Sequence, residues 1–378
     1  MMIQFRPGSH ACRLAEMLSV VGEYPAHSVR LLGNERVYKA LIHKLTTVQA
    51  IRNSRTETEI TCRMINISGK GRTGKSIRLY KAAIPILEWI HPDALKQYLN
   101  ASRNHHFSGD LSHVNRNHRV AEAAAMCMRA GIEYRPYMLP TLQNRKIAKV
   151  IPNKPVFYLA KALKDIGGNE MNKTMFTRMV GAVYSGGNCY ALYNTRNSVM
   201  KWSGMGEFKT LHSLIEIGRL NAGVSRIDSA ILFGESDSVA FETLRASEEN
   251  KRLEFRFDGI YKHIHFIPMN EFGIRLLRLL AVPNWNEKLM DLLFEKEERS
   301  YNQGVFEYDA FVDGKYVFAH LDSDIARLIR FKSAILTRHD IQAEILCFPH
   351  QVLFIREYLG SHTEIKTIPI DAVEAEFT

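Results

Sequence analysis

The 378-residue sequence has only five cysteines, and no two of them form a CxxC pair. This spacing excludes a zinc module made of cysteines alone and argues against a disulfide framework, so we expect a reducing compartment. The longest apolar runs fall far short of the roughly 20 residues that a membrane-spanning helix needs. The amino terminus shows no apolar signal core. We therefore expect a cytoplasmic protein without a membrane partner.

Acidic residues are scarce in the first 150 residues, which hold 10 Asp and Glu against 23 Lys and Arg. The other 228 residues hold 30 against 27, so the basic excess behind the net charge of +10 lies in the first part. This imbalance indicates a polyanionic partner, and nucleic acid is favoured over a membrane because no amphipathic anchor is visible. A solubilising basic surface is the alternative.

The beginning of the chain has the periodicity of three short helices. Residues 10–22 place apolar side chains on one helical face and end at a glycine. Pro25 suits the first turn of a second helix that runs to about Leu32. Asn34 is placed to cap a third helix, NERVYKALIHKL, whose expected apolar face includes Val37. Three such helices with a tight turn between the last two indicate a helix-turn-helix unit.

Two alternating segments, residues 60–67 and 76–80, follow these helices and are joined by SGKGRTGK. Two short strands with a basic, Gly-rich tip predict a winged helix-turn-helix domain over residues 1–98. In such a domain the third helix reads base edges and the wing holds phosphates. The expected DNA-binding residues are Arg36, Lys39, His43 and Lys44 of the third helix, with Lys70, Arg72, Lys75 and Arg78 of the wing.

The wing segment Gly69–Ser76 also matches the P-loop pattern GxxxxGK[ST], which would imply ATP or GTP binding. A P-loop needs a buried parallel strand before it and a long helix after it. The preceding strand is half polar, and Pro85 would fall inside the required helix. A P-loop ATPase is therefore a third hypothesis, and the wing is favoured.

Residues 99–116 are polar, and we interpret them as a linker. The rest of the chain, residues 117–378, alternates strands with helices, which favours a mixed, partly parallel sheet covered by helices. Within it, Asp322 and Asp324 precede a predicted helix and are interpreted as its caps. The predicted fold class is α/β (α+β overall).

Several segments resemble replication-relaxation-type proteins of plasmids and integrative conjugative elements in low-GC Gram-positive bacteria. They are GEYPAHSVRLLGNERVYKALIHKL, ISGKGRTGKSIRLYKAAIPILEWIHPDAL, NHRVAEAAAMCMRAGIE and MFTRMVGAVYSGGNCYALYNTRNSVMKWSGMGEFKTL. The resemblance implies a DNA-binding winged helix joined to a degenerate restriction-nuclease-like domain with a mixed sheet. It also implies a role in element replication, transfer or regulation, beside relaxase or replication proteins.

A metal-dependent nuclease or nicking enzyme is the main competing hypothesis. Glu207-Phe208-Lys209 has the ExK form of restriction-type nucleases, but no aspartate lies between 166 and 227, so Glu122 would have to substitute. His263-Ile264-His265 on a strand would put both imidazoles on one face, as in a relaxase metal site. For Glu207 and Lys209 we favour an ordinary surface pair at a helix start. For His263 and His265 we favour the polar face of a half-buried strand. We expect no cofactor, with Mg²⁺ or Mn²⁺ only for a nuclease.

The sequence thus predicts a sequence-specific protein of a mobile genetic element that binds double-stranded DNA. Its first domain makes the DNA contacts, and its α/β domain serves assembly, partner binding or regulation. A homodimer is compatible with this function because winged helices often read paired half-sites.

Overall fold

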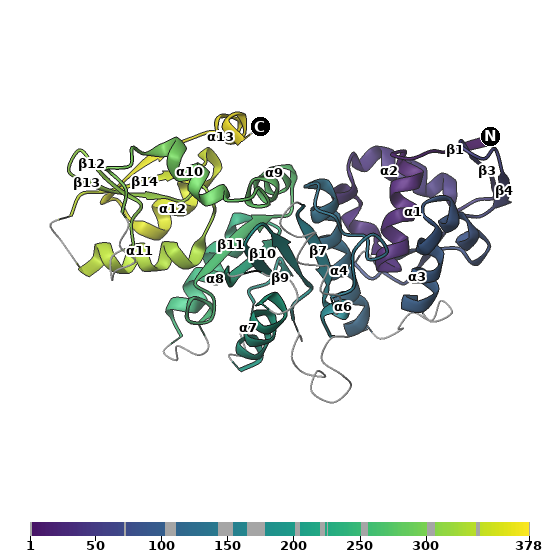
Figure 1. Ribbon diagram of the computed structural model, residues 1–378, viewed down its shortest axis with the longest axis horizontal. Coiled ribbons are helices and arrows are strands. Elements are labelled where there is room, and N and C mark those ends of the chain that lie inside the picture. The colour runs from purple at the N-terminus through teal and green to yellow at the C-terminus, as the bar shows by residue number, and fades with distance from the viewer. Residues whose placement is uncertain are drawn as a thin grey trace. The chain divides into compact units, whose positions relative to one another are not determined.

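The computed structural model describes residues 2–71, 73–102, 111–142, 154–164, 178–200, 205–219, 224, 226–250, 256–300, 307–337 and 341–377. The chain divides into two compact units. Unit 1 consists of Met1–Pro140 and Phe157–Leu159, and unit 2 of Thr141–Val156 and Ala160–Thr378. Both units combine helices with sheets, so the predicted α/β class is confirmed (Figure 1). Among the described residues, no helix has the length and apolar character needed to cross a membrane.

The first three helices of unit 1 lie where the periodicity of the sequence predicts them. The third is capped by Asn34, whose Oδ1 accepts a hydrogen bond from the backbone N–H of Val37 at 3.2 Å. The prediction for its apolar face is wrong in one detail, because the Val37 side chain is 43% exposed. The three helices are α1 (His10–Val21), the 3-10 helix η1 (Ala26–Leu32) and α2 (Glu35–Leu45).

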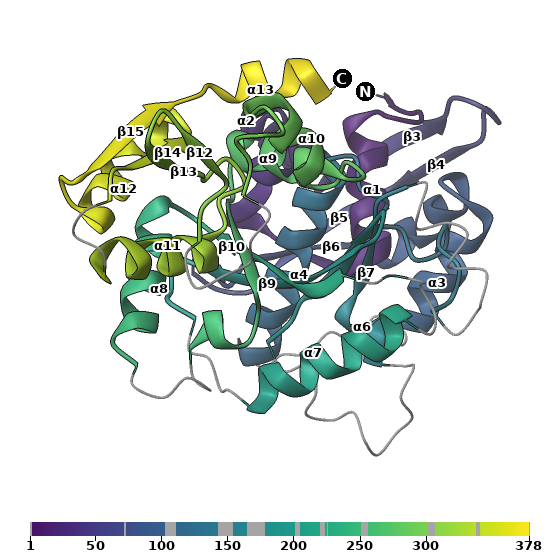
Figure 2. The same cartoon turned by 60° about the vertical axis from the view of Figure 1, so that its left-hand side comes forward.

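Two three-stranded sheets belong to unit 1. One is antiparallel with the order β2-β6-β5, and its strands β5 and β6 flank the predicted wing segment. The other has the order β1-β3-β4, and its strands β3 and β4 lie side by side in Figure 2. Strands β1 and β3 were not predicted, because segments of only four and five residues show too little alternation of apolar and polar side chains. The strands are β1 (Met2–Phe5), β2 (Glu23–Pro25), β3 (Gln49–Asn53), β4 (Glu59–Cys62), β5 (Ile65–Ser68) and β6 (Ser76–Leu79).

A long helix completes unit 1 and corrects the predicted linker. It is α4 (Leu111–Arg129), and it follows η2 (Lys81–Trp89) and α3 (Pro92–Ser102). The ends of the segment 99–116 are therefore helical, whereas residues 103–110 lie outside the described residues.

Three polar side chains of α4 bond to the antiparallel sheet and to η1. Asn117 Nδ2 donates to Glu23 Oε1 at 2.8 Å, and His118 Nε2 lies 2.7 Å from Ser76 Oγ. Ser28 Oγ donates to Glu122 Oε1 at 2.5 Å. This helix is thus an integral part of unit 1, which extends well beyond residue 98.

The first sheet of unit 2 has the order β11-β10-β9-β8, while three of the four residues of the neighbouring strand in the chain, β7, are assigned to unit 1. Its strands β9, β10 and β11 are parallel, while β8 and β9 form an antiparallel hairpin. The strands are β7 (Val156–Leu159), β8 (Gly181–Ser185), β9 (Asn188–Arg196), β10 (Arg226–Gly234) and β11 (His263–Pro268). The helices between them are α6 (Ala160–Lys164), α7 (Met205–Ile217) and α8 (Asp237–Glu248).

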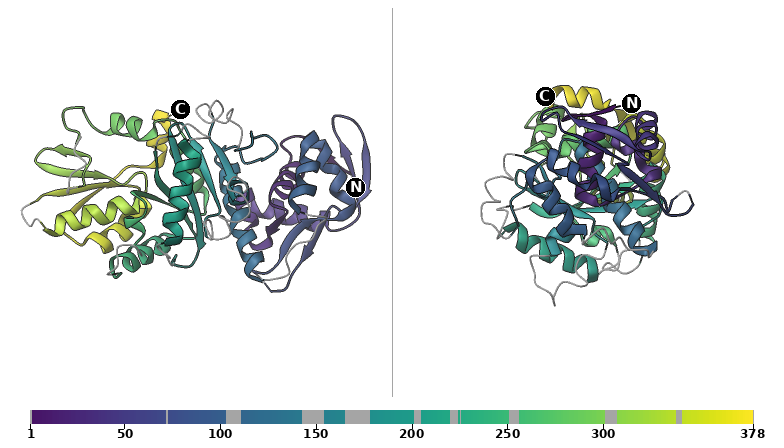
Figure 3. Two further views of the ribbon diagram at one scale, coloured as in Figure 1. Left: turned by 60° about the horizontal axis from the view of Figure 1, so that its bottom comes forward. Right: turned by 90° about the vertical axis from the view of Figure 1, so that its right-hand side faces the viewer.

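The second sheet of unit 2 has the order β12-β13-β14-β15, with β13, β14 and β15 parallel (Figure 3). Its strands are β12 (Ala310–Val312), β13 (Lys315–Ala319), β14 (Ala343–Cys347) and β15 (Thr363–Thr367). The helices of this region are α9 (Glu271–Leu280), α10 (Trp285–Leu293), α11 (Ile325–Thr337), α12 (Val352–Leu359) and α13 (Ile370–Phe377). Because α11 follows β13 directly, the connecting loop lies at the carboxyl end of a parallel strand.

Candidate functional site

The predicted DNA-binding residues of α2 are mostly exposed. Arg36, Lys39 and His43 are exposed, and Lys44 is half-buried. Lys39 Nζ lies 2.5 Å from Glu35 Oε1, an exposed pair one helical turn apart. Such a pair is worth only a few tenths of a kcal/mol, so it does not hold Lys39 back from a phosphate.

The predicted wing segment lies between β5 and β6 in the chain. Gly69 has φ +96°, and a Cβ at this position would come within 2.0 Å of the carbonyl oxygen of Gly74. Only glycine fits there, because an L side chain would collide with backbone. Lys70 and Lys75 are exposed in this segment, whereas Arg72 lies outside the described residues.

Arg78, the eighth predicted DNA-binding residue, is directed to an internal partner. Its Nε and Nη2 atoms donate to Glu23 Oε2 at 3.1 and 2.7 Å. The Glu23 side chain is completely buried, and the Arg78 side chain is 22% exposed. A buried carboxylate that loses its cation is costly. Arg78 therefore neutralises Glu23 inside unit 1.

The P-loop hypothesis is wrong. Lys75 is followed by strand β6, where a nucleotide-binding loop requires the start of a helix. The strand before the loop, β5, is antiparallel to β6. The turn therefore lacks the helix N-terminus whose backbone N–H groups would hold phosphates.

Residues 207 and 209 lie in a helix, as the favoured interpretation of an ordinary Glu–Lys pair at a helix start predicted, and this conflicts with the alternative of a nuclease ExK pair. Glu207 and Lys209 lie in α7, not on a strand, and residues two positions apart on a helix do not face each other. Glu207 is buried with Arg178 Nη1 3.8 Å from its Oε1 atom, whereas Lys209 is exposed. Glu122 belongs to unit 1, where it accepts the Ser28 hydrogen bond. Within unit 2, Glu207 and Lys209 therefore do not form a catalytic pair.

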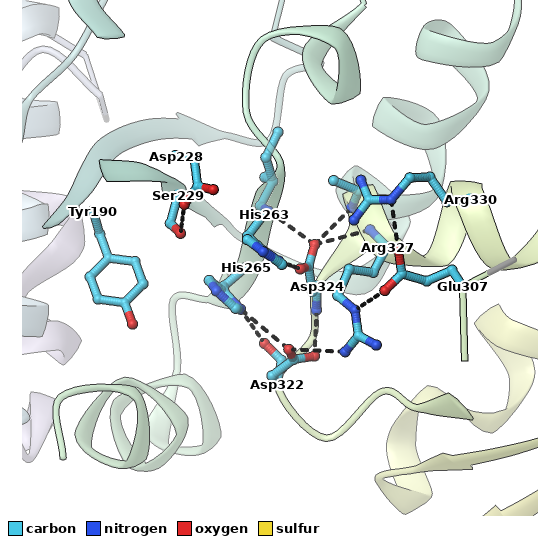
Figure 4. Close-up of polar contacts among 12 residues, drawn as sticks. Tyr190, Asp228, Ser229, His263, His265, Glu307, Asp322, Asp324, Arg327 and Arg330 are labelled. Atoms are coloured by element: carbon cyan, nitrogen blue, oxygen red, sulfur yellow. Dashed lines mark hydrogen bonds and ion pairs between the residues drawn. The ribbon is translucent and has the colours of Figure 1, made fainter. Parts of the chain in front are cut away.

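Strand β11 places both His263 and His265 against two aspartates, so these two predicted site residues do lie in one cluster (Figure 4). The Nδ1–H of His263 donates to Oδ2 of Asp324 at 2.7 Å. The Nδ1–H of His265 donates to the backbone carbonyl of Asp322 at 2.9 Å. The interpretation of these residues as the polar face of a half-buried strand is wrong for His265, which is 2% exposed, whereas the His263 side chain is 30% exposed. We refer to His263, His265, Asp322 and Asp324 as the His–Asp cluster.

Asp324 is the most heavily bonded member of the cluster. Its Oδ1 accepts hydrogen bonds from the backbone N–H groups of Ile264, Ala326 and Arg327 at 3.0–3.1 Å. The last two open α11, so the predicted capping role of Asp324 is confirmed. Burial disfavours the charged form, but the hydrogen bond from His263 and nearby positive charge hold the pKa of Asp324 well below its usual value.

Asp322 has fewer partners. Its Oδ1 accepts from the backbone N–H of Asp324 at 3.0 Å. Its Oδ2 lies 3.9 Å from His265 Nδ1 and 4.0 Å from Arg327 Nη1, and both separations are too long for hydrogen bonds. Burial raises the pKa of this carboxyl. Asp322 is thus a buried acid whose outer oxygen has only distant cations among the described residues.

Arg327 binds two further acids that the sequence analysis did not select. Its Nε donates to Glu307 Oε1 at 2.7 Å, and its Nη2 donates to Asp309 Oδ1 at 2.6 Å. Arg330 Nε also donates to Glu307, at 2.9 Å. The available sequence signal was an Asp-x-Asp pair directly after an apolar strand, which the analysis assigned to helix capping alone.

Known proteins offer no neighbour for this chain. No family model matches it, and neither a curated protein nor a solved structure does. Function must therefore be argued from the basic residues of unit 1 and from the His–Asp cluster of unit 2.

Proposed function

We propose that the protein binds double-stranded DNA through unit 1, with α2 in the major groove and the β5–β6 turn against the phosphate backbone. The observation that carries the proposal is the order of the elements. Helix α1, strand β2, helices η1 and α2, and strands β5 and β6 follow one another, and β2 pairs with the last strand. This is the arrangement expected of a winged helix, with β3 and β4 as an additional hairpin after α2.

The exposed face of α2 supports base reading in addition to phosphate binding. Val37 and Ala40 are exposed there between Arg36 and His43, at helical spacing. Arginine is the usual partner of guanine in the major groove, and small apolar side chains contact the thymine methyl group. A mixed face of this kind favours sequence-specific binding over purely electrostatic binding.

A mobile-element role remains part of the proposal and depends on the resemblance of the segments quoted above. In that setting unit 2 would recruit a relaxase or a replication protein, and two copies of the chain would read paired half-sites. We do not extend the proposal to DNA cleavage. Three of the four members of the His–Asp cluster are less than 5% exposed, which leaves no access for a phosphodiester.

The test is fluorescence anisotropy of the full chain on a random DNA duplex over a series of salt concentrations. We expect the logarithm of the affinity to fall steeply with the logarithm of the salt concentration, because binding releases counterions. The double variant Lys70→Ala/Lys75→Ala should lower the magnitude of this slope by about two, since each lysine neutralises one phosphate.

The matched control is Lys288→Ala/Lys296→Ala, which removes two exposed lysines of unit 2. This variant has the same net charge as the wing variant, so a general charge effect would change both slopes equally. Equal slopes for the two variants would refute the assignment of the wing. Absence of duplex binding by the wild-type chain would refute the proposed function itself.

A further inference from the structure

Arg327 connects the His–Asp cluster to further charged residues of unit 2. Four carboxylates lie along the connected contacts, from Glu307 and Asp309 through Arg327 to Asp322 and Asp324. The guanidinium groups paired with them are those of Arg327 and Arg330. Burying charge without compensation is strongly unfavourable.

The ligand geometry is consistent with such an ion. His265, Asp322 and Asp324 each offer one ligand atom, and these atoms lie within 4.8 Å of one another. Ligands of a tetrahedral zinc ion at about 2.0 Å lie about 3.3 Å apart, so modest side-chain rotation would bring the three groups to binding distance. One imidazole nitrogen with two carboxylate oxygens is a donor set that suits Mn²⁺ or Zn²⁺.

Two further observations point to a ligand at this place. The first is Asp322 Oδ2, which faces His265 and Arg327 at 3.9 and 4.0 Å without a hydrogen bond among the described residues (Figure 4). The second is His320, which directly follows β13 and is completely buried. Neither of its ring nitrogens has a hydrogen-bond partner among the described residues. Buried polar atoms of native proteins normally have partners, so the two ring nitrogens of His320 require an explanation.

We propose that His265, Asp322 and Asp324 bind one divalent transition-metal ion, of the Mn²⁺ or Zn²⁺ class, that joins β11 to the loop before α11. His263 then acts as an outer partner, because its hydrogen bond to Asp324 orients that carboxylate. Since the three ligands are buried, the ion has a structural role, and this inference is independent of DNA binding by unit 1.

The loop already contacts β11 through the backbone. The N–H of Phe266 donates to the carbonyl of Ser323 at 2.9 Å, and the N–H of Ile264 donates to Asp324. An ion across the same contact would couple the start of α11 to the parallel strand. It would therefore raise the thermal stability of unit 2 in particular.

The experiment uses the full chain without an affinity tag, treated with a chelator and dialysed. Thermal unfolding is measured after addition of Zn²⁺, Mn²⁺ or Mg²⁺, and the bound metal is counted by elemental analysis after removal of free ions. We expect one Zn²⁺ or Mn²⁺ per chain and, at a hundredfold excess over Kd, a rise in Tm of about 5–10 °C.

The test variant is Asp322→Asn, because asparagine keeps the shape and the Oδ1 acceptor while removing the charge. The matched control is Asp313→Asn, in an exposed turn whose φ of +49° suits asparagine. We expect Asp322→Asn to lose the stoichiometric ion and the rise in Tm, and Asp313→Asn to keep both. Equal behaviour of the two variants, or a wild-type chain that retains no ion and shows no shift, would overturn the proposal.

Cobalt spectroscopy of the wild-type chain keeps the question decidable if Asp322→Asn fails to fold. A Co²⁺ ion held by one imidazole and two carboxylates in a dry site is expected to absorb visible light more strongly than hydrated Co²⁺. Zinc added afterwards should abolish this absorption by competition. A spectrum identical to that of the free ion would overturn the proposal without any variant.

Discussion

The two units use charged residues in opposite ways. Unit 1 holds 20 Lys and Arg against 10 Asp and Glu, and its basic residues on α2 and on the wing are largely exposed. Unit 2 holds 30 of each kind, yet Asp322, Asp324 and Arg327 are buried together. The net charge of a unit therefore shows only which sign of charge is in excess. The burial of a charged side chain shows whether it needs a partner inside the protein. In unit 1 the pairs of Lys39 with Glu35 and of Arg52 with Glu57 lie at the surface, whereas in unit 2 Arg327 is buried with its acids.

The largest effect is expected at Arg327. Replacing it with methionine should lower the free energy of unfolding by about 3–5 kcal/mol, because Glu307 and Asp309 would lose the guanidinium that binds both. Urea denaturation of the purified chain measures this loss. Arg330→Met on the same helix is the control, since its side chain is 30% exposed and it should cost about 1 kcal/mol or less. Equal losses would show that burial does not decide the contribution of these charges.

Glu23 is an exception to the difference between the two units, because it is a fully buried acidic residue in the unit whose basic residues are largely exposed. Glu23→Gln should cost about 2 kcal/mol, because Arg78 and Asn117 would lose a charged acceptor. The same denaturation measurement applies. Glu57→Gln, which removes a carboxylate 78% exposed beside Arg52, should change stability by no more than about 0.5 kcal/mol.

Two glutamates around Arg135 should give opposite responses to pH. Burial opposes the charged form of Glu133, but hydrogen bonds from Arg135 lower its pKa below the usual value. Burial raises the pKa of Glu16, which lies 3.6 Å from the same arginine. Glu133 thus contributes stability above its unfolded pKa that is lost as the pH falls through its folded pKa. The contribution of Glu16 is present below its unfolded pKa and is lost as the pH rises through its folded pKa.

Denaturation measured between about pH 3 and 6 checks these signs around the ordinary glutamate pKa. Glu133→Gln should make the rise of stability with pH shallower, and Glu16→Gln should make it steeper. A change of the same sign in both variants would mean that Arg135 does not distinguish the two carboxyl groups.

The smallest effect on stability is expected on the exposed face of α2. Arg36→Ala should change the free energy of unfolding by less than about 0.5 kcal/mol, because the side chain is exposed and the substitution favours helix. Its affinity for the preferred DNA sequence should nevertheless fall by about tenfold or more if Arg36 contacts a base. A stability loss as large as that of Glu23→Gln would place Arg36 among the internally paired charges.

The fold was largely predictable because its main signals are local. Helical periodicity located α1 and α2, and Asn34 predicted the cap that the structure shows. The order of strands and helices in unit 2 followed from apolar runs between turn residues. Strand β1 was missed because its four residues pair with β3, a partner nearly fifty positions away that no local pattern reveals.

The His–Asp cluster was only half predictable for the same reason. The spacing of His263 and His265 is visible in the sequence, but Asp324 joins His263 across 61 positions. The topology of two sheets brings these segments together, and a single sequence does not specify that pairing. The favoured interpretation of Glu207 and Lys209, an ordinary surface pair at a helix start, was correct about the helix but wrong about the surface, because Glu207 is buried.

Helix α4 has a practical consequence for dissecting the molecule. A fragment that ends at residue 98 or 116 would lack Asn117, His118 and Glu122, and would leave Glu23, Ser28 and Ser76 without these partners. Such a fragment would aggregate or unfold for reasons unrelated to DNA, and its failure to bind would be misread as evidence against the wing. Truncation experiments should keep the chain to at least Leu159, the last residue of unit 1.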